Sequence, residues 1–180
     1  MQTINGRPFY FMRHGETDHN LYGLYDDSVD VQLNKTGENQ ALKLQKLCSV
    51  LGISTVCASP LIRAQQTKNI LFEKNPINDV TVQQFRECPG FFWKLFLAYE
   101  RRALTESEWG EINSFIQVVK NGLIRSLNEK SPILIVAHGG IYWALMHLLQ
   151  VKGNKKIGNC LLRYFIPNNN GWNSEVVKIR

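Results

Sequence analysis

Phe9-Tyr10-Phe11-Met12-Arg13-His14-Gly15 is a short apolar run that ends abruptly in polar residues. The run predicts a buried strand, and it places Arg13 and His14 at the carboxyl end of that strand. Ligands of open α/β sheets bind at this edge. Arg13 puts a fixed cation beside a histidine that is able to act as a nucleophile or a base, and Gly15 lets backbone amides approach an anion. We therefore expect an anion site here, in which His14 attacks phosphorus.

A second apolar run, Ile133-Leu134-Ile135-Val136-Ala137, is followed by His138-Gly139-Gly140. A single buried histidine is more often a hydrogen-bonded core residue than a catalytic group, but two at equivalent strand ends favour a shared site. If the two strands are neighbours, both imidazoles project into one crevice. Arg63 falls in the first turn of the helix expected after a strand at 55–58, which brings a positive helix end to the same edge. Its planar guanidinium is able to bind two phosphate oxygens at once.

Strands and helices alternate along the whole chain. The expected strands, after the opening one, are 55–58, 80–85, 133–137, 161–166 and 175–179. The expected helices are 34–51, one capped by Ser59 with Pro60 at its first position, 94–104, 108–127 capped by Ser107, and 141–149. The segments 16–33 and 89–93 are expected to be loops. This alternation predicts one α/β domain over residues 1–180, a three-layer sandwich whose mostly parallel sheet is covered by helices on both faces.

Composition and charge limit the class of protein. The 180 residues are 44% hydrophobic and 20% charged, as in ordinary globular proteins. No apolar run is long enough to span a bilayer, and residues 1–7 lack the apolar core of a signal peptide, so a cytoplasmic protein without membrane contact is expected. The formal net charge of +6 falls in residues 91–180 and suits an anionic partner. The charges are scattered and form no nucleic-acid motif, which favours a small phosphorylated molecule over nucleic acid.

Neither a metal nor another cofactor is expected. The four cysteines are widely spaced, form no C-x-x-C pair and are expected to be free thiols. The four histidines lack the spacing of a zinc site, and Asp26, Asp27 and Asp30 lack the spacing of an EF-hand. His19 belongs to the first loop and is expected to be exposed. No feature of the sequence indicates an oligomeric state.

Four motifs resemble those of one protein family. Arg13-His14-Gly15-Glu16-Thr17, followed by Asn20, resembles the signature of the histidine phosphatase superfamily, whose other major members are phosphoglycerate mutases. The segments 59–67, Arg86-Glu87 and 137–140 are similar to the family's second motif, its acid-donor segment and its last motif. Weaker similarities occur at Leu33-Asn34 with Gly37 and Gln40-Ala41, at Glu106-Ser107 and at Asn159-Cys160. All of them follow the family order, which implies the phosphoglycerate mutase-like fold.

The resemblance implies a role for each motif residue. His14 would be the nucleophile and would carry the phosphoryl group as a phosphohistidine. Arg13, Arg63 and His138 would hold the equatorial oxygens, so that three cationic donors replace a metal. Glu87 would protonate the leaving alkoxide and then activate water, which calls for a raised pKa beside the apolar segment 91–93. The alternative for Glu87 is a surface carboxylate paired with Arg86.

Further residues are candidates for substrate binding. Asn20 and Gly139 are expected at the phosphate, where Thr17 is able either to donate a hydrogen bond or to brace the loop. Arg101 and Arg102 resemble a paired arginine of mutases that clamps the substrate, although a solvated helix face explains the pair equally well. The organic part of the substrate is expected to contact an aromatic group, which consists of Phe91, Phe92, Trp93, Phe96 and Tyr99.

Departures from the family pattern favour a phosphatase over a mutase. Leu24 and Asp27 stand where members with doubly phosphorylated substrates usually place a basic residue and a glycine. Asp26 and Asp27 would repel a second phosphate. The segment between Glu87 and His138 leaves little room for a lid that keeps water from the phosphohistidine of a mutase. The sequence therefore predicts a metal-independent phosphomonoesterase of the histidine acid type, acting on a small phosphorylated metabolite. The alternatives are a mutase-like phosphotransferase and a non-catalytic module that binds a phosphorylated ligand.

Overall fold

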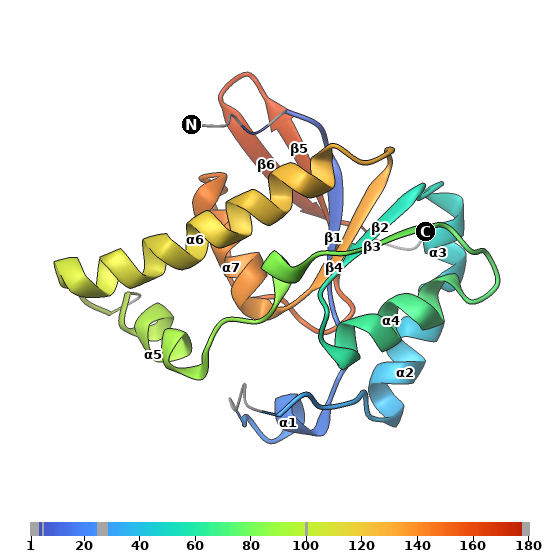
Figure 1. Ribbon diagram of the computed structural model, residues 1–180, viewed down its shortest axis with the longest axis horizontal. Helices are drawn as coiled ribbons and strands as arrows, with labels where there is room; N and C mark the ends of the chain where they lie inside the picture. Colours follow the sequence, from blue (N-terminus) through green and yellow to red (C-terminus); the bar gives the residue numbers. More distant parts are fainter. Residues whose placement is uncertain (1–3, 5, 25–28, 100, 178–180) are drawn as a thin grey trace.

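Six strands form one sheet within residues 4, 6–24, 29–99 and 101–177, which a computed structural model describes (Figure 1). The strands are β1 Phe9–Arg13, β2 Thr55–Ala58, β3 Asn78–Thr81, β4 Ile133–Ala137, β5 Leu162–Asn168 and β6 Gly171–Val176. They lie in the order β3-β2-β4-β1-β5-β6. The first four of this order run parallel to one another, whereas β5 and β6 are antiparallel to their neighbours. The predicted α/β class with a mostly parallel sheet is confirmed.

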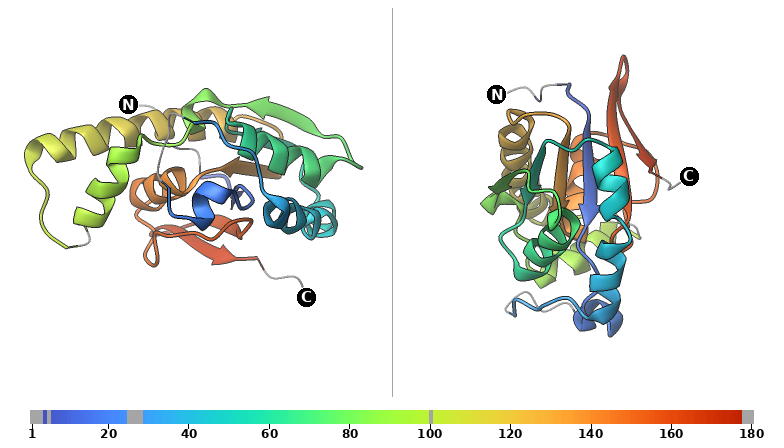
Figure 2. Two further views of the ribbon diagram at one scale, coloured as in Figure 1. Left: turned by 90° about the horizontal axis from the view of Figure 1, so that it is seen from below. Right: turned by 90° about the vertical axis from the view of Figure 1, so that its right-hand side faces the viewer.

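Helices cover both faces of this sheet. They are α1 Asp18–Leu21, α2 Lys35–Leu42, α3 Gln45–Val50, α4 Ile62–Phe72, α5 Gly90–Tyr99, α6 Glu106–Leu127 and α7 Gly139–Leu148, with a 3-10 turn, η1, at Gln83–Phe85. α6 and α7 lie on one face and α2, α3 and α4 on the other (Figure 1), so the predicted three layers are confirmed. At one edge the β5–β6 hairpin extends beyond the helices (Figure 2). None of these helices is long and apolar enough to cross a lipid bilayer.

The central strand β4 shows how the two faces are filled. Successive side chains of a strand point to opposite faces, and all five residues of β4 are buried. Ile133, Ile135 and Ala137 pack into the core beneath α6 and α7, whereas Leu134 and Val136 pack into the core beneath α2 and α4. An unbroken run of buried aliphatic residues is typical of such a strand.

The pairing of β1 with β4 brings the two histidine motifs together. Arg13 lies opposite Ala137 in the register of these parallel strands, so His14 and His138 follow at the same level. The His14 N–H also donates to the Ala137 carbonyl at 3.0 Å, which extends the pairing past the end of the strand. The expectation that the two strands are neighbours is confirmed.

The helix expected over 34–51 is wrong in one respect, because the segment forms two helices, α2 and α3. Asn34 caps α2 by accepting a hydrogen bond from the Gly37 N–H at 2.9 Å. At the break the Leu44 N–H donates to the Ala41 carbonyl, three residues before it, which tightens the turn. The bend keeps Leu44 packed against the core beneath α4.

The strand expected over 80–85 ends earlier, and the chain after it turns toward the core. β3 stops at Thr81, and the residues after it form η1. Phe85 is fully buried, and a Cβ on Gly122 of α6 would lie 2.8 Å from its ring. The chain leaves the sheet at this point because Phe85 fills the space that the glycine leaves open.

Four expected helix starts are also wrong, those of α4, α5, α6 and α7, and α7 begins at Gly139 and not at 141. α4 begins at Ile62 with Leu61 in the cap position, and the Ser59 hydroxyl accepts a hydrogen bond from the Leu61 N–H at 3.2 Å without capping the helix. Arg63 still lies in the first turn, as expected. α5 begins at Gly90, inside the segment expected to be a loop, and ends before the predicted 104. Pro89 suits this start, because proline lacks an N–H that the first turn of a helix would leave unpaired.

The long helix α6 is capped by Thr105, which corrects the prediction of Ser107. The Thr105 hydroxyl accepts a hydrogen bond from the Glu108 N–H at 3.3 Å, and the Glu108 carboxylate accepts one from the Thr105 N–H at 2.8 Å. This reciprocal pair is a capping box, which satisfies two amides at the start of the helix.

Replacing Thr105→Ala should lower the free energy of unfolding by about 1 kcal/mol, because it removes the side-chain acceptor of the capping box. Ser107→Ala is the matched control and should change it by less than about 0.5 kcal/mol, since Ser107 lies inside the first turn. Urea denaturation of both variants measures the two values. Equal losses would contradict the assignment of the cap.

Candidate active site

His14 is held as a neutral imidazole with a defined tautomer. It is 1% exposed, and its Nδ1 lies 2.7 Å from the Gly15 carbonyl oxygen, which can only accept a hydrogen bond. Nδ1 therefore carries the proton, and Nε2 accepts a hydrogen bond from the Arg63 Nε–H at 3.3 Å. Burial lowers the pKa of His14 well below its ordinary value, and the charges of Arg13 and Arg63 lower it further. The Nε2 lone pair is thus available as a nucleophile.

His138 lies beside His14, with 5.1 Å between the centres of the two rings. Its Nε2 is 2.6 Å from the hydroxyl oxygen of Ser59, and burial lowers the pKa of His138 well below its ordinary value. The Ser59 O–H is able to donate to Nε2, and in that tautomer His138 carries its proton on Nδ1. Nδ1 is buried and has no hydrogen-bond partner within the described part of the chain. A buried donor of this kind suits a bound anion.

Two arginines put positive charge beside the histidines. Arg13 ends β1 and donates from Nη1 to the Ile157 carbonyl at 3.1 Å. Arg63 is buried in the first turn of α4, and its Nη1 lies 3.7 Å from an oxygen of Asp30. The same carboxylate accepts a hydrogen bond from the Ile62 N–H at 2.9 Å, so Asp30 fixes the start of α4 as well as the guanidinium. Planar guanidinium groups in such fixed positions are suited to phosphate oxygens.

Gly15 has a different role from the one predicted for it. Its N–H donates to the Thr67 hydroxyl at 2.9 Å, and Thr67 in turn donates to the Arg63 carbonyl at 2.7 Å, so this amide does not face an anion. A Cβ on Gly15 would lie 2.6 Å from the Gly37 carbonyl oxygen. The glycine is needed because the loop after β1 meets the backbone of α2 directly.

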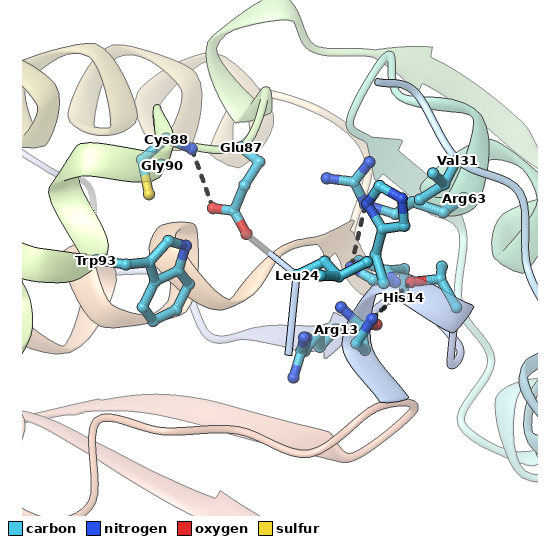
Figure 3. Close-up of a pocket in the computed structure, with 12 residues that line it drawn as sticks. Arg13, His14, Leu24, Val31, Arg63, Glu87, Cys88, Gly90 and Trp93 are labelled. Carbon is cyan, nitrogen blue, oxygen red and sulfur yellow. Dashed lines mark hydrogen bonds between the residues drawn. The ribbon is translucent and has the colours of Figure 1, made fainter. Parts of the chain in front are cut away.

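Glu87 lies in the wall of the same cavity with a raised pKa. One carboxylate oxygen, Oε1, accepts hydrogen bonds from the N–H groups of Cys88 and Gly140, each at 3.0 Å. Figure 3 shows the other oxygen pointing away from Cys88 and into the cavity. Burial raises the pKa of Glu87, although the Cys88 N–H and the two arginines oppose the shift. Within the described residues, Glu87 is bonded to amides and not paired with Arg86, which is exposed.

The cavity has a charged side and an apolar side. It is lined by Arg13, His14, Thr17, His19, Asn20, Leu24, Val31, Arg63, Glu87, Cys88, Gly90 and Trp93. In Figure 3, His14 and Arg63 face Glu87 and Trp93 across it. A Cβ on Gly139 would lie 2.9 Å from the Trp93 ring, and a Cβ on Gly140 would lie 2.5 Å from the Glu87 carboxylate. The two glycines therefore let Trp93 and Glu87 approach the start of α7.

The structure brings most of the predicted residues together. His14, Arg13, Arg63, Glu87, Thr17 and Asn20 line the cavity, and His138 and Gly139 adjoin it. Thr17 is buried and accepts a hydrogen bond from the Asn20 N–H at 3.2 Å, so it braces the loop. Arg101 and Arg102 are exposed and do not line this cavity, and Arg102 donates to both oxygens of Glu108 at 2.6 and 2.9 Å.

The predicted aromatic group is mostly elsewhere. Among its five described members, Trp93 alone lines the cavity. Phe92 and Phe96 are buried in the core, Phe91 is exposed, and Tyr99 packs edge-on against Trp109. The prediction placed Phe91, Phe92 and Trp93 in a loop, whereas helix α5 spans all five aromatic residues and directs them to different sides.

Several residues of the site were not found from the sequence. His19 was expected to be exposed but is half-buried and lines the cavity. Ser59 was interpreted as a helix cap and instead holds His138. The signal for Ser59 was its position directly after β2, at the same sheet edge as the histidines.

Metal-binding side chains and cysteine thiols are the other groups that could carry chemistry. No group of three or more His, Cys, Asp or Glu side chains that could hold a metal ion occurs in residues 4, 6–24, 29–99 and 101–177. Cys48, Cys57, Cys88 and Cys160 are all buried free thiols, and Cys88 lies at the cavity. Asp26 and Asp27 lie outside the described residues.

Comparison with known proteins identifies relatives over nearly the whole chain. Residues 9–179 match the family described as histidine phosphatase superfamily (branch 1). The chain is 30% identical over 164 residues to an agropine synthesis reductase of Rhizobium rhizogenes, a match that covers 82% of this chain and 36% of that protein. It is 28% identical over 141 residues to the phosphatase PhoE of Bacillus subtilis (strain 168), covering 75% of this chain and 73% of PhoE. The chain thus spans little more than a third of the length of the reductase.

A solved structure has the same architecture. The crystal structure of phosphoserine phosphatase from Entamoeba histolytica, in complex with 3-phosphoglyceric acid, matches with a TM-score of 0.71 and 22% identity. The match covers 95% of each chain. At this identity the likeness shows the fold, and it agrees with the sheet order and layers described above.

The buried histidines predict that the folded protein loses stability in acid. Burial lowers the pKa of His14 and His138 well below 6.5. Between pH 6.5 and those lowered values, the unfolded chain binds protons that the folded chain does not. The free energy of unfolding should therefore fall as the pH drops, by about 1.4 kcal/mol per pH unit for each histidine.

Urea denaturation from about pH 7.5 to about pH 5 measures this slope in the wild type and in His138→Gln, whose slope should be smaller by the contribution of one histidine. Glu87 acts in the opposite sense because its pKa is raised, but it is present in both proteins and its effect cancels in the comparison. Identical slopes would contradict the buried neutral state of His138.

Proposed function

Because the chain belongs to the histidine phosphatase superfamily, we propose that it is a metal-independent phosphomonoesterase that works through a phosphohistidine on His14. One observation carries the proposal. The neutral Nε2 of His14 lies 3.3 Å from the Arg63 guanidinium, in a cavity that Glu87 also lines. A nucleophile, a cation for the oxygens and a carboxyl group with a raised pKa are the groups that this phosphoryl transfer needs.

In the first step, Nε2 of His14 attacks phosphorus while the bond from phosphorus to the leaving oxygen breaks. The proton on Glu87 goes to that oxygen, so the alcohol leaves as a neutral molecule. Arg13, Arg63 and the Nδ1–H of His138 offset the charge on the equatorial oxygens. The imidazole that carries the phosphoryl group keeps its proton on Nδ1, which continues to donate a hydrogen bond to the Gly15 carbonyl.

In the second step, the roles of Glu87 reverse. The carboxylate left by the first step takes a proton from water, and the resulting hydroxide attacks phosphorus. The bond between phosphorus and Nε2 breaks, inorganic phosphate leaves, and both His14 and Glu87 return to their starting states. The oxygen of Glu87 that points into the cavity is the one suited to both proton transfers, because Oε1 is held by two amides.

Access of water supports hydrolysis over transfer to a second substrate. The cavity has an empty volume of about 480 Å³, which includes space open to solvent. Among its described lining residues, fixed positive charge comes from Arg13 and Arg63, which both adjoin His14. Beyond them, Leu24 and Trp93 offer no charge to a second phosphate. Repulsion of that phosphate by Asp26 and Asp27 stays a prediction.

The apolar side of the cavity bears on the substrate. Leu24 and Trp93 line the space that a leaving group would enter beside Glu87, whereas Val31 lies on the side of Arg63 (Figure 3). Such walls bind uncharged organic groups and leave orientation to a few polar contacts. The substrate we propose is therefore a small phosphorylated metabolite with an apolar or ring-bearing organic part.

Two finer aspects belong to the same proposal. The first step needs a protonated Glu87, so turnover should decline as the pH rises through the raised pKa of this residue. This pH dependence is the sense in which the enzyme is of the acid type.

We place the protein in the cytoplasm, with Arg101 and Arg102 outside the catalytic machinery.

Hydrolysis of 4-nitrophenyl phosphate in the presence of a chelator tests the reaction. The wild type should turn over, and His14→Ala should lose activity by about 10⁴-fold or more, because the substitution removes the Nε2 that attacks phosphorus in the proposed first step. A phosphohistidine is hydrolysed in acid but survives in alkali. Mixing the protein with labelled ester and quenching rapidly in alkali should therefore trap the intermediate, and only in the wild type. Arg102→Ala is the control and should keep activity within about twofold.

Three outcomes would contradict the proposal in different ways. Turnover that requires a divalent metal would overturn the mechanism. Phosphate delivered to an added alcohol or phosphoglycerate in preference to water would favour the mutase-like alternative. Binding of phosphate without any turnover would favour the non-catalytic module.

A panel of phosphate esters tests the substrate class. Esters with aromatic leaving groups should have larger kcat/KM values than compact bisphosphates, and Trp93→Ala should raise KM for the aromatic esters by about tenfold through lost apolar contact. Phe91→Ala is the matched control, since this aromatic residue of the same helix is exposed and outside the cavity. Preference for bisphosphates, or equal effects of the two substitutions, would contradict the assignment of the apolar side.

A further inference from the structure

A short turn between α7 and β5 is bonded to the segment that carries the nucleophile. The Ile157 carbonyl accepts a hydrogen bond from Arg13 Nη1 at 3.1 Å, and the Cys160 N–H donates to the Arg13 carbonyl at 2.9 Å. Between them, Asn159 Nδ2 donates to the His14 carbonyl at 3.0 Å. The turn at 157–160 therefore holds Arg13 and His14 from the side of β1 that faces β5, opposite to the side that pairs with β4.

Asn159 also reaches a residue of the cavity wall. Its Nδ2 lies 3.0 Å from the side-chain oxygen Oδ1 of Asn20, so its two amide hydrogens serve two acceptors, the His14 carbonyl and Asn20. The reverse orientation of Asn159 would set an acceptor against the His14 carbonyl, which has no hydrogen to give. The hydrogen bonds thus define which way the Asn159 amide faces.

The orientation of Asn159 determines that of Asn20. Because Oδ1 of Asn20 accepts from Asn159, the NH₂ group of Asn20 lies on the other side of Cγ, away from Asn159. Asn20 lines the cavity, half-buried, next to His14. An anion in the cavity would therefore meet a donor from Asn20, whereas a rotated amide would present an oxygen to it.

The backbone of the turn is unusual in a way that fits this role. Cys160 has φ of 51°, in the left-handed region that residues with a Cβ rarely adopt. Such a conformation is strained for a residue with a Cβ and persists where the surroundings require it. Here it aims the Cys160 N–H at the Arg13 carbonyl while the preceding Asn159 side chain reaches His14 and Asn20.

We propose that Asn159 is a positioning residue for the phosphoryl group, which it serves by fixing the Asn20 amide with its N–H groups toward the cavity. This role rests on the proposed function in one respect, namely that the bound anion is a phosphoryl group. Asn159 itself does not line the cavity, so it acts through Asn20 and through the His14 peptide.

A double-mutant cycle on Asn159 and Asn20 tests the role, with the dissociation constant of inorganic phosphate as the readout. Asn159→Leu removes both hydrogen bonds at similar volume and without adding charge. It should weaken phosphate binding by about fivefold to tenfold in the wild-type background but by about twofold or less in Asn20→Ala, because the amide that it orients is then missing. Isothermal titration calorimetry measures the constants without any need for turnover.

Asn154→Leu is the matched control. Asn154 belongs to the same connection between α7 and β5, and its side chain accepts a hydrogen bond from the Lys156 N–H at 2.8 Å without contacting His14 or Asn20. It should leave the phosphate constant unchanged within about twofold. Thermal unfolding identifies any variant that fails to fold, and Asn159→Ala then takes the place of Asn159→Leu in the cycle.

The outcomes separate this role from a purely structural one and from the reaction. Losses that add across the cycle would overturn the proposal, since packing alone predicts no coupling to Asn20. A protein that binds phosphate with the expected coupling but hydrolyses no ester would contradict the proposed function and support the role of Asn159. A wild type that binds no phosphate would overturn both.

Discussion

The parallel pairing of β1 with β4 is the constraint on which the site depends. It sets Arg13 opposite Ala137 and so delivers His14 and His138 to one level of the sheet edge. β2, on the far side of β4, delivers Ser59 and the start of α4 to the same edge. Each strand is buried on both faces, and a shift in its register would cost much of the core. The geometry of the polar groups is therefore maintained by apolar packing.

Burial favours the neutral forms of three titratable groups in the site, namely His14, His138 and Glu87. Two guanidinium groups stand beside two imidazoles whose pKa values are lowered by burial, and opposite a carboxyl whose pKa is raised by burial. The carboxyl groups of Glu87 and Asp30 both favour the charged Arg63, and Arg13 donates to the Ile157 carbonyl. A bound phosphate dianion would add negative charge beside the two guanidinium groups.

The sequence was sufficient for the parts of the molecule that have a local or periodic signal. β2 and β4 were predicted with their observed bounds, and the residues expected around His14 are together in the cavity. The errors lie where a tertiary contact overrides local preference. Phe85 packs against Gly122 and so does not continue the predicted strand. Thr105, and not the expected Ser107, caps α6, because Glu108 forms the reciprocal hydrogen bonds of the capping box with it.

Other parts of the site had no local signal at all. Gly15 was interpreted from its flexibility alone, and its contact with Gly37 depends on how the loop after β1 meets α2. The aromatic residues 91–99 were all assigned to the ligand, since a sequence does not show which side of a helix faces the cavity. Only the packing of α5 against α7 separates Trp93 from Phe92 and Phe96.

The strand that carries His14 has a consequence for the time course of folding. β1 lies near the start of the chain, yet both of its neighbours, β4 and β5, come after residue 132. The hydrogen bond from Asn159 to His14 closes a loop of 145 residues. Contacts between segments so distant in sequence slow folding, and the end of β1 that carries His14 acquires its neighbours only when the last third of the chain has joined the sheet.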